Sequence, residues 1–289
     1  MKKVAVVTDS NSGITQSQGK ELGIYVVPMP FMVDGETYYE DISMSQEEFY
    51  TKLLSGTDVI TSQPSLDHLS QLWEEILCNY DEIIHIPMSS GLSSSCESAT
   101  VLARGYSGRV EVANNLRISV VQRQSTLDAI KLAAAGKSAL EIKTILEEDC
   151  FNCSIYIMLD TLYYLKKGGR ITPAAAMLGS VLKIKPVLQI QGDKLDAFAK
   201  ARSISQGKTL MLNAIKSDLQ NRFGGATVEN VRLHIAHTMN LEAALSLKQE
   251  MEVIYPGIPI YVDCLSLSVA CHIGPGALAI ACSRNLKVS

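Results

Sequence analysis

The sequence predicts an α/β protein with two domains: an N-terminal three-layer domain around a parallel sheet, and a C-terminal two-layer α+β domain. Two patterns support this prediction. In the first half, short β-branched runs alternate with helical periods, which is typical of parallel strands covered by helices on both faces. In the second half, glycine-containing turns join neighbouring strands into hairpins between helices. The change of pattern places the boundary near Asn152, giving domains 1–152 and 153–289.

The first domain is expected to begin with a buried strand at Val4–Val7 that runs into a polar loop. Asp34-Gly35 between two apolar segments indicates a hairpin turn. Ser45 and Glu48 have the spacing of a capping box, which opens a helix that ends at Gly56. The other elements expected here are helices at Thr15–Leu22, Asp67–Cys78, Ser93–Gly105 and Ser138–Asp149, and strands at Ile24–Val27, Ile83–Ile86 and Ile118–Val121.

The second domain is expected to mix a hairpin with longer helices. Gly192-Asp193 separates two short apolar runs and predicts the hairpin turn. The expected strands are Ser154–Leu159, Val187–Ile190, Leu195–Lys200, Val231–His237, Ile260–Cys264 and Ala277–Cys282, and the expected helices lie before Lys166 and at Pro173–Leu178, Ser205–Arg222 and Leu241–Val253.

Composition excludes several classes of protein. The 289 residues are 47% apolar and 19% charged, so the chain can bury a core and is not disordered. The net charge of 26 − 30 = −4 argues against nucleic acid or an anionic membrane as a partner. The first apolar run has only four residues, Val4–Val7, and no apolar stretch reaches about 18 residues. We therefore expect neither a signal peptide nor stable membrane insertion. Seven scattered cysteines favour a reducing cytoplasm over a disulfide framework.

Five loops rich in glycine and small hydroxyl residues follow predicted strands or helices. In open α/β sheets, ligands bind beyond the carboxyl ends of the strands, where hydroxyls, backbone N–H groups and helix N-termini favour an anion. An ordinary turn or helix cap is the alternative for any single loop. The five loops are Thr8–Gly13, Thr61–Ser65, Ser89–Ser95, Lys167–Arg170 and His272–Gly276.

Motifs for the common catalytic chemistries are missing from the sequence. Gly207-Lys208-Thr209 and Gly136-Lys137-Ser138 resemble the end of a phosphate-binding loop, but the first glycine of that motif is absent in both cases. No G-x-S-x-G elbow and no H-E-x-x-H pair occurs, and no cysteine pair has zinc spacing near a histidine. The sequence therefore predicts no metal site and no resident nucleotide cofactor.

Taken together, six short motifs resemble one family. They are Thr8–Ser10, Thr61–Pro64, Ser89–Ser93, Lys167–Ile171, Lys185–Val187 and His272–Leu278. In this order they are similar to the DegV family of bacterial fatty-acid-binding proteins, which includes the carrier subunits of fatty acid kinase. The resemblance covers nearly the whole chain.

The resemblance implies that a long-chain fatty acid of the palmitate, stearate or oleate class is held between the two domains. It implies that Thr61, Ser93 and His272 contact the carboxylate. Arg170 and Arg202 would serve a separate ATP-binding kinase subunit, which forms an acyl phosphate from the bound acid. The chain itself would then be a non-catalytic lipid carrier in phospholipid metabolism. The polar loops that would support the site include Ser62, Ser90, Gly91, Gly274 and Gly276.

The sequence also departs from the family pattern. Many members have Asp-Ser-Lys after the strand that we place at Ile118–Val121, whereas this chain has Gln122-Arg123-Gln124 and a shortened helix that we expect to begin at Ser125. Gly13 replaces an acidic residue of the first loop. Neither change falls on a candidate carboxylate ligand.

Other interpretations of the same residues stay open. The protein could be a lipid-responsive sensor, or a stand-alone small-molecule enzyme that uses Ser93 or His272. Pro28–Met32 and Ala174–Leu178 could line a tunnel for an alkyl chain, or simply pack in the core. Arg170 and Arg202 could bind phosphate or a partner, or be ordinary solvated arginines.

Overall fold

A computed structural model describes residues 2–178 and 184–287, which form two compact units. Unit 1 extends to Cys150 and also includes Leu286, while unit 2 comprises Phe151–Asn285. This division lies close to Asn152, and we propose 1–152 and 153–289 as the two folding domains. Within the described ranges, no helix combines the length and the apolarity needed to cross a bilayer.

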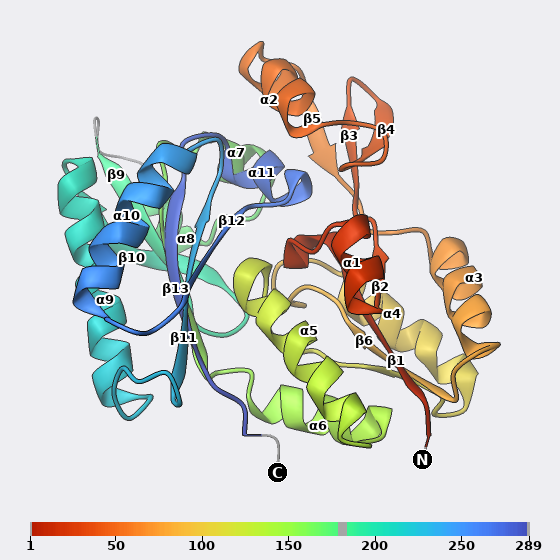
Figure 1. The fold of residues 1–289 in the computed structure, drawn as a ribbon. Coiled ribbons are helices and arrows are strands. Elements are labelled where there is room, and N and C mark those ends of the chain that lie inside the picture. The colour runs from red at the N-terminus through yellow and green to blue at the C-terminus, as the bar shows by residue number, and fades with distance from the viewer. Residues whose placement is uncertain (1, 179–183, 288–289) are drawn as a thin grey trace. The chain divides into compact units, whose positions relative to one another are not determined.

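Unit 1 is built around a four-stranded parallel sheet with the strand order β2-β1-β6-β7. This sheet confirms the parallel arrangement that the alternating pattern predicts (Figure 1). The elements of unit 1 are β1 (Val4–Asp9), η1 (Ser10–Ser12), α1 (Gln16–Leu22), β2 (Tyr25–Val27), β3 (Pro30–Val33), β4 (Glu36–Tyr39), α2 (Gln46–Leu54), β5 (Val59–Thr61), α3 (Leu66–Leu77), β6 (Glu82–Ile86), α4 (Ser95–Ala103), η2 (Arg104–Tyr106), β7 (Val110–Val112), α5 (Ser119–Ala134) and α6 (Ala139–Glu148).

Helices cover both faces of this sheet, which makes the unit three-layered. Successive side chains of a strand point to opposite faces. Accordingly, Ala5 and Val7 of β1 pack in one core with α3 and α4, around Trp73. Val6 packs in a second core with α5 and α6. Both faces are apolar because both are buried, which explains the continuous apolar run of β1.

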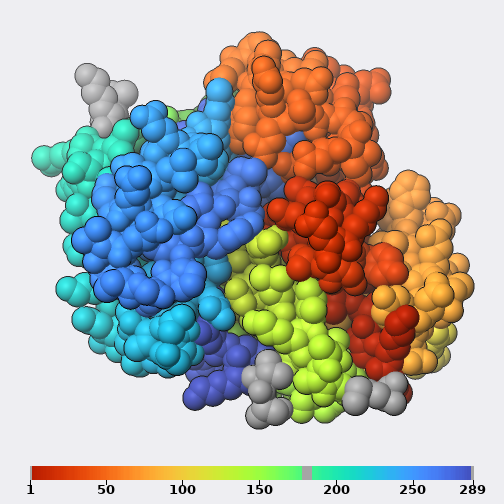
Figure 2. All heavy atoms as spheres, in the orientation of Figure 1, coloured from red at the N-terminus to blue at the C-terminus, as the bar shows by residue number. Residues whose placement is uncertain are grey.

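A small antiparallel sheet, with the order β4-β3-β5, is inserted after β2. Asp34 and Gly35 both have positive φ, which gives the tight hairpin turn expected from the sequence. Phe31 packs edge-on against Phe49 of α2, so the helix covers one face of this sheet. In the space-filling view, the atoms of this insertion form a continuous orange lobe (Figure 2). The sequence predicts the hairpin and α2, but not the pairing of β3 with β5.

The prediction of a strand at Ile118–Val121 is wrong. The last parallel strand is β7, and residues 119–134 form α5. Ile118, Val120 and Val121 are buried, so their β-branched side chains fill the core from the start of a helix rather than from a strand. Gln122-Arg123-Gln124 therefore lies on α5 and does not follow a strand, and α5 begins at Ser119 rather than Ser125.

Unit 2 is built around a six-stranded mixed sheet with the order β10-β9-β8-β13-β11-β12. Among the strands that the structure describes in this sheet, only the β11–β12 pair is parallel. The elements of unit 2 are β8 (Cys153–Met158), α7 (Tyr163–Lys167), α8 (Pro173–Leu178), β9 (Lys185–Ile190), β10 (Leu195–Ala201), α9 (Ile204–Asn221), β11 (Val231–His237), α10 (Leu241–Ile254), β12 (Ile260–Cys264), α11 (Leu267–Ile273) and β13 (Leu278–Arg284).

The hairpin β9–β10 and the mixed sheet confirm the α+β architecture expected for the second half. Met211 and Ile215 of α9 and Leu247 of α10 pack in one core with the strands, so these two long helices cover the sheet. One local expectation is wrong. His272 does not lie in the glycine-rich turn but at the end of α11, and the turn begins at Gly274, which has a φ of 74°.

Candidate functional site

The parallel sheet has a topological switch point between β1 and β6, where the order in which strands are added changes from one side of β1 to the other. From β1 the chain first adds β2 on one side, and later β6 on the other. Such a switch point leaves room for a ligand beyond the carboxyl ends of the two strands. Here the two strand ends lead into Asp9 and into the loop Met88–Ser94. The sequence-predicted loops Thr8–Gly13 and Ser89–Ser95 therefore share one edge of the sheet.

Asp9 joins these two loops. Its Oδ2 accepts the backbone N–H of Met88 at 2.8 Å. Its Oδ1 accepts the backbone N–H of Asn11 and the side-chain amide of Gln122, each at 3.0 Å. The carboxyl is 2% exposed. Burial raises the pKa of Asp9 to about 6, and the three hydrogen bonds oppose this shift.

The serine loop is held in shape by its own side chains and by Asn114. Ser90 donates its N–H to Asn114 Oδ1 at 3.3 Å, and Asn114 Nδ2 donates to Ser90 Oγ at 2.8 Å. Gly91 donates its N–H to Ser89 Oγ. Half-buried Ser93 accepts the Ser95 N–H on its Oγ at 3.2 Å, which leaves the Ser93 hydroxyl proton available to a ligand.

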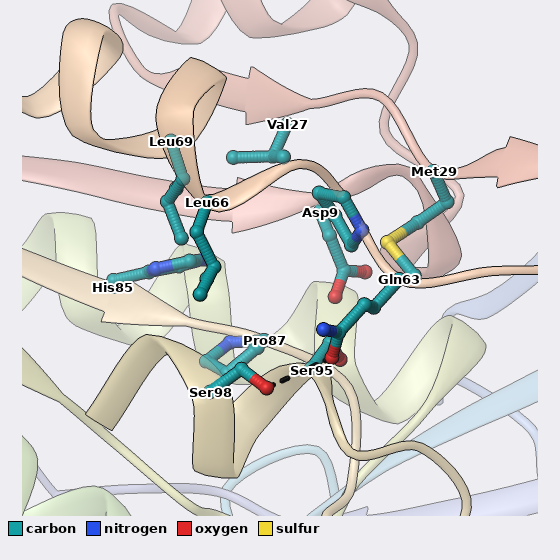
Figure 3. Close-up of a pocket in the computed structure, with 11 residues that line it drawn as sticks. Asp9, Val27, Met29, Gln63, Leu66, Leu69, His85, Pro87, Ser95 and Ser98 are labelled. Atoms are coloured by element: carbon teal, nitrogen blue, oxygen red, sulfur yellow. Dashed lines mark hydrogen bonds between the residues drawn. The ribbon is translucent and has the colours of Figure 1, made fainter. Parts of the chain in front are cut away.

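Thr61 is half-buried at the end of β5, where it pairs with Phe31. The ladder weakens immediately afterwards, because the Ser62 N–H reaches Pro30 O only at 3.5 Å. Gln63 then connects this segment to α4. Its Oε1 accepts the hydroxyl of Ser98 at 2.8 Å and that of Ser94 at 3.3 Å (Figure 3). The structure therefore links the segment carrying Thr61 to the segment carrying Ser93.

A small pocket lies beneath these loops. Asp9, Gln63, His85, Ser95 and Ser98 line it together with apolar side chains (Figure 3). Its volume is about 10 Å³, which suits one water molecule rather than an alkyl chain. Burial lowers the pKa of His85 to about 3, so this imidazole is neutral at pH 7.

The second group of predicted residues lies in unit 2, around His272. Its ring packs directly on the chain at Gly168, where a Cβ would lie 2.0 Å from His272 Nδ1. Tyr164 packs on Gly274 in the same way, with a Cβ at 2.2 Å from the ring. These contacts join α7 to α11 and fix the direction of His272. Gly168 is thus a steric requirement, whereas a Cβ at Gly169 would meet open space and this glycine instead supplies a positive φ of 68°.

Electrostatics keep His272 uncharged. Burial, with a smaller contribution from the nearby Arg170 guanidinium, lowers the pKa of its imidazole to about 4. At pH 7 the ring therefore offers one N–H donor and one acceptor nitrogen without a charge. Gly276 belongs to the turn after α11, and the Asp160 carboxylate packs where its Cβ would be, at 2.6 Å.

Arg170 is exposed and follows α7. Its guanidinium donates to the Gly168 carbonyl at 2.7 Å, which holds the side chain beside the glycine turn. Arg202 is also exposed and lies between β10 and α9, where its backbone N–H donates to Gln206 Oε1 at 2.7 Å. Only Arg170 is shown to be close to His272.

The structure thus groups Thr61, Ser93 and their neighbours in unit 1, and His272, Arg170 and the two turn glycines in unit 2. Sequence reasoning missed the part played by Asp9, Gln63 and Gln122. The signal for Asp9 was a charged residue directly after a buried strand. Gln63 and Gln122 gave no such signal, because their partners are distant in sequence.

Two further expectations concern metals and apolar segments. Among residues 2–178 and 184–287, no cluster of histidine, cysteine or acidic side chains has the arrangement of a metal site.

The two apolar segments that could line a tunnel differ in burial. Met29, from the first apolar segment, is buried and lines the small pocket. In the second segment Ala175 is buried and Met177 is exposed, whereas the side chain of Leu178 lies outside the described part.

Fold and loops define a two-unit α/β protein with polar loops at the switch point of its parallel sheet. The family model of the DegV family, described as uncharacterised protein, matches residues 3–285. This chain belongs to the DegV family. Protein DegV of Bacillus subtilis (strain 168) is 30% identical over 281 residues, which cover 96% of this chain and 98% of that protein.

Solved structures give the same assignment. The structure of a DegV family protein from Thermus thermophilus, which is described as binding fatty acid, superposes on this chain with a TM-score of 0.88 at 28% sequence identity. DegV from Bacillus subtilis, described as a fatty acid binding protein, gives a TM-score of 0.87 at 28% identity. Each comparison covers 99% of this chain and 100% of the other.

Proposed function

We propose that this chain binds a long-chain fatty acid and presents its carboxyl group to a separate ATP-dependent kinase subunit. In this proposal Thr61 and Ser93 of unit 1 and His272 of unit 2 contact the carboxylate. The observation that carries it is the chemistry of these three groups: two hydroxyls, and an imidazole that is neutral at pH 7. The fatty acids bound by the relatives from Thermus thermophilus and Bacillus subtilis support the choice of ligand.

Neutral donors suit a carboxylate that must react later. Each hydroxyl donates one hydrogen bond, and hydrogen bonds to a charged acceptor are about twice as strong as neutral ones. A direct arginine pair would withdraw more electron density from the oxygens and would have to be broken when the acid is phosphorylated. His272 adds a donor without adding charge, because its pKa is depressed to about 4.

The alkyl chain supplies most of the affinity in this proposal. At about 0.8 kcal/mol per buried CH₂, the 14 methylenes of palmitate gain up to about 11 kcal/mol on transfer from water. Loss of translational and conformational freedom offsets much of this gain. A net affinity in the micromolar range or tighter is therefore compatible with a head group held only by hydrogen bonds.

In the kinase step, the partner would transfer the γ-phosphoryl group of ATP to a carboxylate oxygen, which gives an acyl phosphate and ADP. In this proposal Arg170 steadies phosphate oxygens or contacts the partner, and its exposure and its hydrogen bond to the Gly168 carbonyl beside His272 support this role. We assign the same task to Arg202, which is also exposed.

Lipid extraction of the purified protein followed by mass spectrometry tests the binding proposal. We expect a long-chain fatty acid to co-purify. Thr61→Ala and Ser93→Ala should each weaken binding by about 1.5–3 kcal/mol, the cost of removing a hydrogen bond to a charged group. Thr144→Ala, a hydroxyl deletion on the exposed surface of α6, is the control. An empty protein that binds no fatty acid in a titration would refute the proposal.

The kinase step has its own test. Arg170→Ala should leave fatty acid affinity unchanged but reduce acyl-phosphate formation by the reconstituted pair, whereas Arg104→Ala, an exposed arginine of unit 1, should not. If the partner forms acyl phosphate at the normal rate with the Arg170→Ala variant, the proposed role of Arg170 is refuted. ATPase or esterase turnover by the isolated chain, lost in Ser93→Ala, would instead favour a stand-alone enzyme.

A further inference from the structure

Gln63 occupies the junction between the two hydroxyl-bearing segments of unit 1. It lies two positions after Thr61 in sequence, just beyond the point where the ladder of β5 ends. Its Oε1 accepts hydrogen bonds from Ser98, in the first turns of α4, and from Ser94, the neighbour of Ser93. Figure 3 shows the Gln63 side chain pointing toward this helix, with a dashed line marking its hydrogen bond with Ser98.

The geometry makes Gln63 the side-chain link between these segments. The Ser62 N–H contact to Pro30 is long at 3.5 Å, so backbone pairing holds the segment only weakly beyond Thr61. Both bonds from α4 end on one amide oxygen, at 2.8 and 3.3 Å. Breaking them would free the segment after β5 to move relative to α4, while the core of the unit stays packed.

The choice of an amide also matters electrostatically. Both serine hydroxyls act as donors, so the geometry requires an acceptor oxygen, which glutamine and glutamate both provide. Glutamate would add a negative charge close to the hydroxyls that are proposed to hold an anion. Glutamine provides the oxygen and keeps the site uncharged.

We propose that Gln63 is a positioning residue that sets the separation of the Thr61 and Ser93 hydroxyls, and so sets the preference of the protein for a carboxylate head group. This inference rests on the proposed function. Gln63 and Ser94 are exposed and Ser98 is half-buried, and both hydrogen bonds lie near the solvent, so they contribute little to folding stability. The consequence of losing them is therefore expected in ligand selectivity rather than in stability.

The experiment compares two ligands, stearate and 1-octadecanol, which share the alkyl chain and differ in the head group. Ser98→Ala, which removes one of the two hydrogen bonds to Gln63, should weaken stearate binding by about 3-fold, and Gln63→Leu, which removes both, by about 10-fold. Affinity for 1-octadecanol should fall by less, so the ratio of the two affinities drops. Because both substitutions break the same contact, the double variant should lose no more than the weaker-binding single variant.

The substitution Gln63→Glu separates the effect of hydrogen-bonding geometry at position 63 from the effect of a negative charge there. It retains the acceptor oxygens, so 1-octadecanol should bind as it does to the unmodified protein, while stearate binding weakens through repulsion between carboxylates. Gln71→Leu on the exposed surface of α3 is the matched control and should change neither affinity. Thermal unfolding midpoints of all variants should equal that of the parent, and Ser98→Ala decides the question if Gln63→Leu fails to fold.

The outcomes separate the two proposals. If the unmodified protein binds no stearate, the proposed function fails. If it binds stearate and the selectivity ratio is unchanged in both Gln63→Leu and Ser98→Ala, the function stands and the role of Gln63 is refuted. Additive losses in the double variant would also refute it, because independent effects cannot arise from one shared contact.

Discussion

The two groups of candidate ligand-binding residues are held by different physical means. In unit 1, hydrogen bonds fix the loops: Asp9 holds Met88, and Asn114 holds Ser90. In unit 2, close packing over glycines fixes the imidazole of His272 at Gly168. Hydrogen bonds position the loops that carry hydroxyl groups, whereas packing positions a ring that has few polar atoms. The two regions should therefore respond to opposite kinds of substitution.

Removing a polar group should damage unit 1 most. Asp9→Ala leaves the Met88 and Asn11 N–H groups without their acceptor in a buried site and removes one of the acceptors of the Gln122 amide, which should lower the free energy of unfolding by about 3 kcal/mol. The single tryptophan, Trp73, is buried in the core of unit 1, so its fluorescence during urea unfolding reports this unit. Asp193→Ala, at an exposed turn, is the control. An unchanged midpoint would show that Asp9 does not organise these loops.

Adding a single methyl group at Gly168 should disturb the ligand-binding residues of unit 2. Gly168 has an ordinary helical φ of −80°, so Gly168→Ala creates no backbone strain, and its Cβ acts only by displacing His272. We expect stearate affinity to fall by about tenfold, with the Trp73 transition unchanged. Gly105→Ala, where the Cβ meets open space, should be neutral. If Gly168→Ala lowers affinity equally when His272 is already alanine, the effect does not act through His272.

Acidification should affect the two regions in opposite directions. Asp9 has a folded pKa of about 6, above the ordinary aspartate pKa of 3.8, so its contribution to stability is largest below pH 4 and declines as the pH rises through 6. His272 has a folded pKa of about 4, below 6.5, so its contribution is present above pH 6.5 and declines as the pH falls towards 4. Between pH 7 and 5, Asp9 should add about 1 kcal/mol and His272 should remove about 2 kcal/mol.

Paired variants measure these pH effects. The free energy of unfolding is measured for the parent and for Asp9→Asn at pH 7 and at pH 5. The difference between the two proteins should change by about 1 kcal/mol over this range, because the contributions of all other titrating groups cancel. His272→Phe isolates the second effect in the same way, with unfolding followed by circular dichroism. Equal slopes for the parent and a variant would mean that the residue does not titrate differently in the folded and unfolded chain.

The smallest expected effect sharpens the description of the serine loop. Ser90→Ala removes the hydroxyl that accepts Asn114 Nδ2 but leaves the backbone bond from Ser90 to Asn114 in place. We expect a loss of about 1 kcal/mol in the Trp73 transition. Asn114→Ala removes both bonds and should cost more. The reverse order would show that Ser90 has another, larger role.

Local rules predicted much of the fold from the sequence. The turn at Asp34-Gly35 and the capping box at Ser45 and Glu48 depend only on residues within a few positions of one another, and both are present. The prediction of a strand at Ile118–Val121 was wrong because it used the same kind of local preference. Local preference favours a strand for β-branched residues, but burial on the parallel sheet placed these side chains in the first turn of α5.

Sequence alone determined the alternation of strands and helices, the mixed character of the second half and the polar loop that carries Ser93. These features follow from periodicity and turn chemistry, which act over a few residues. Only the tertiary structure decided that Asp9 reaches Met88, that Gln63 reaches Ser98 and that His272 rests on Gly168. Each of these contacts joins segments far apart in the chain, and packing rather than local preference brings such segments together.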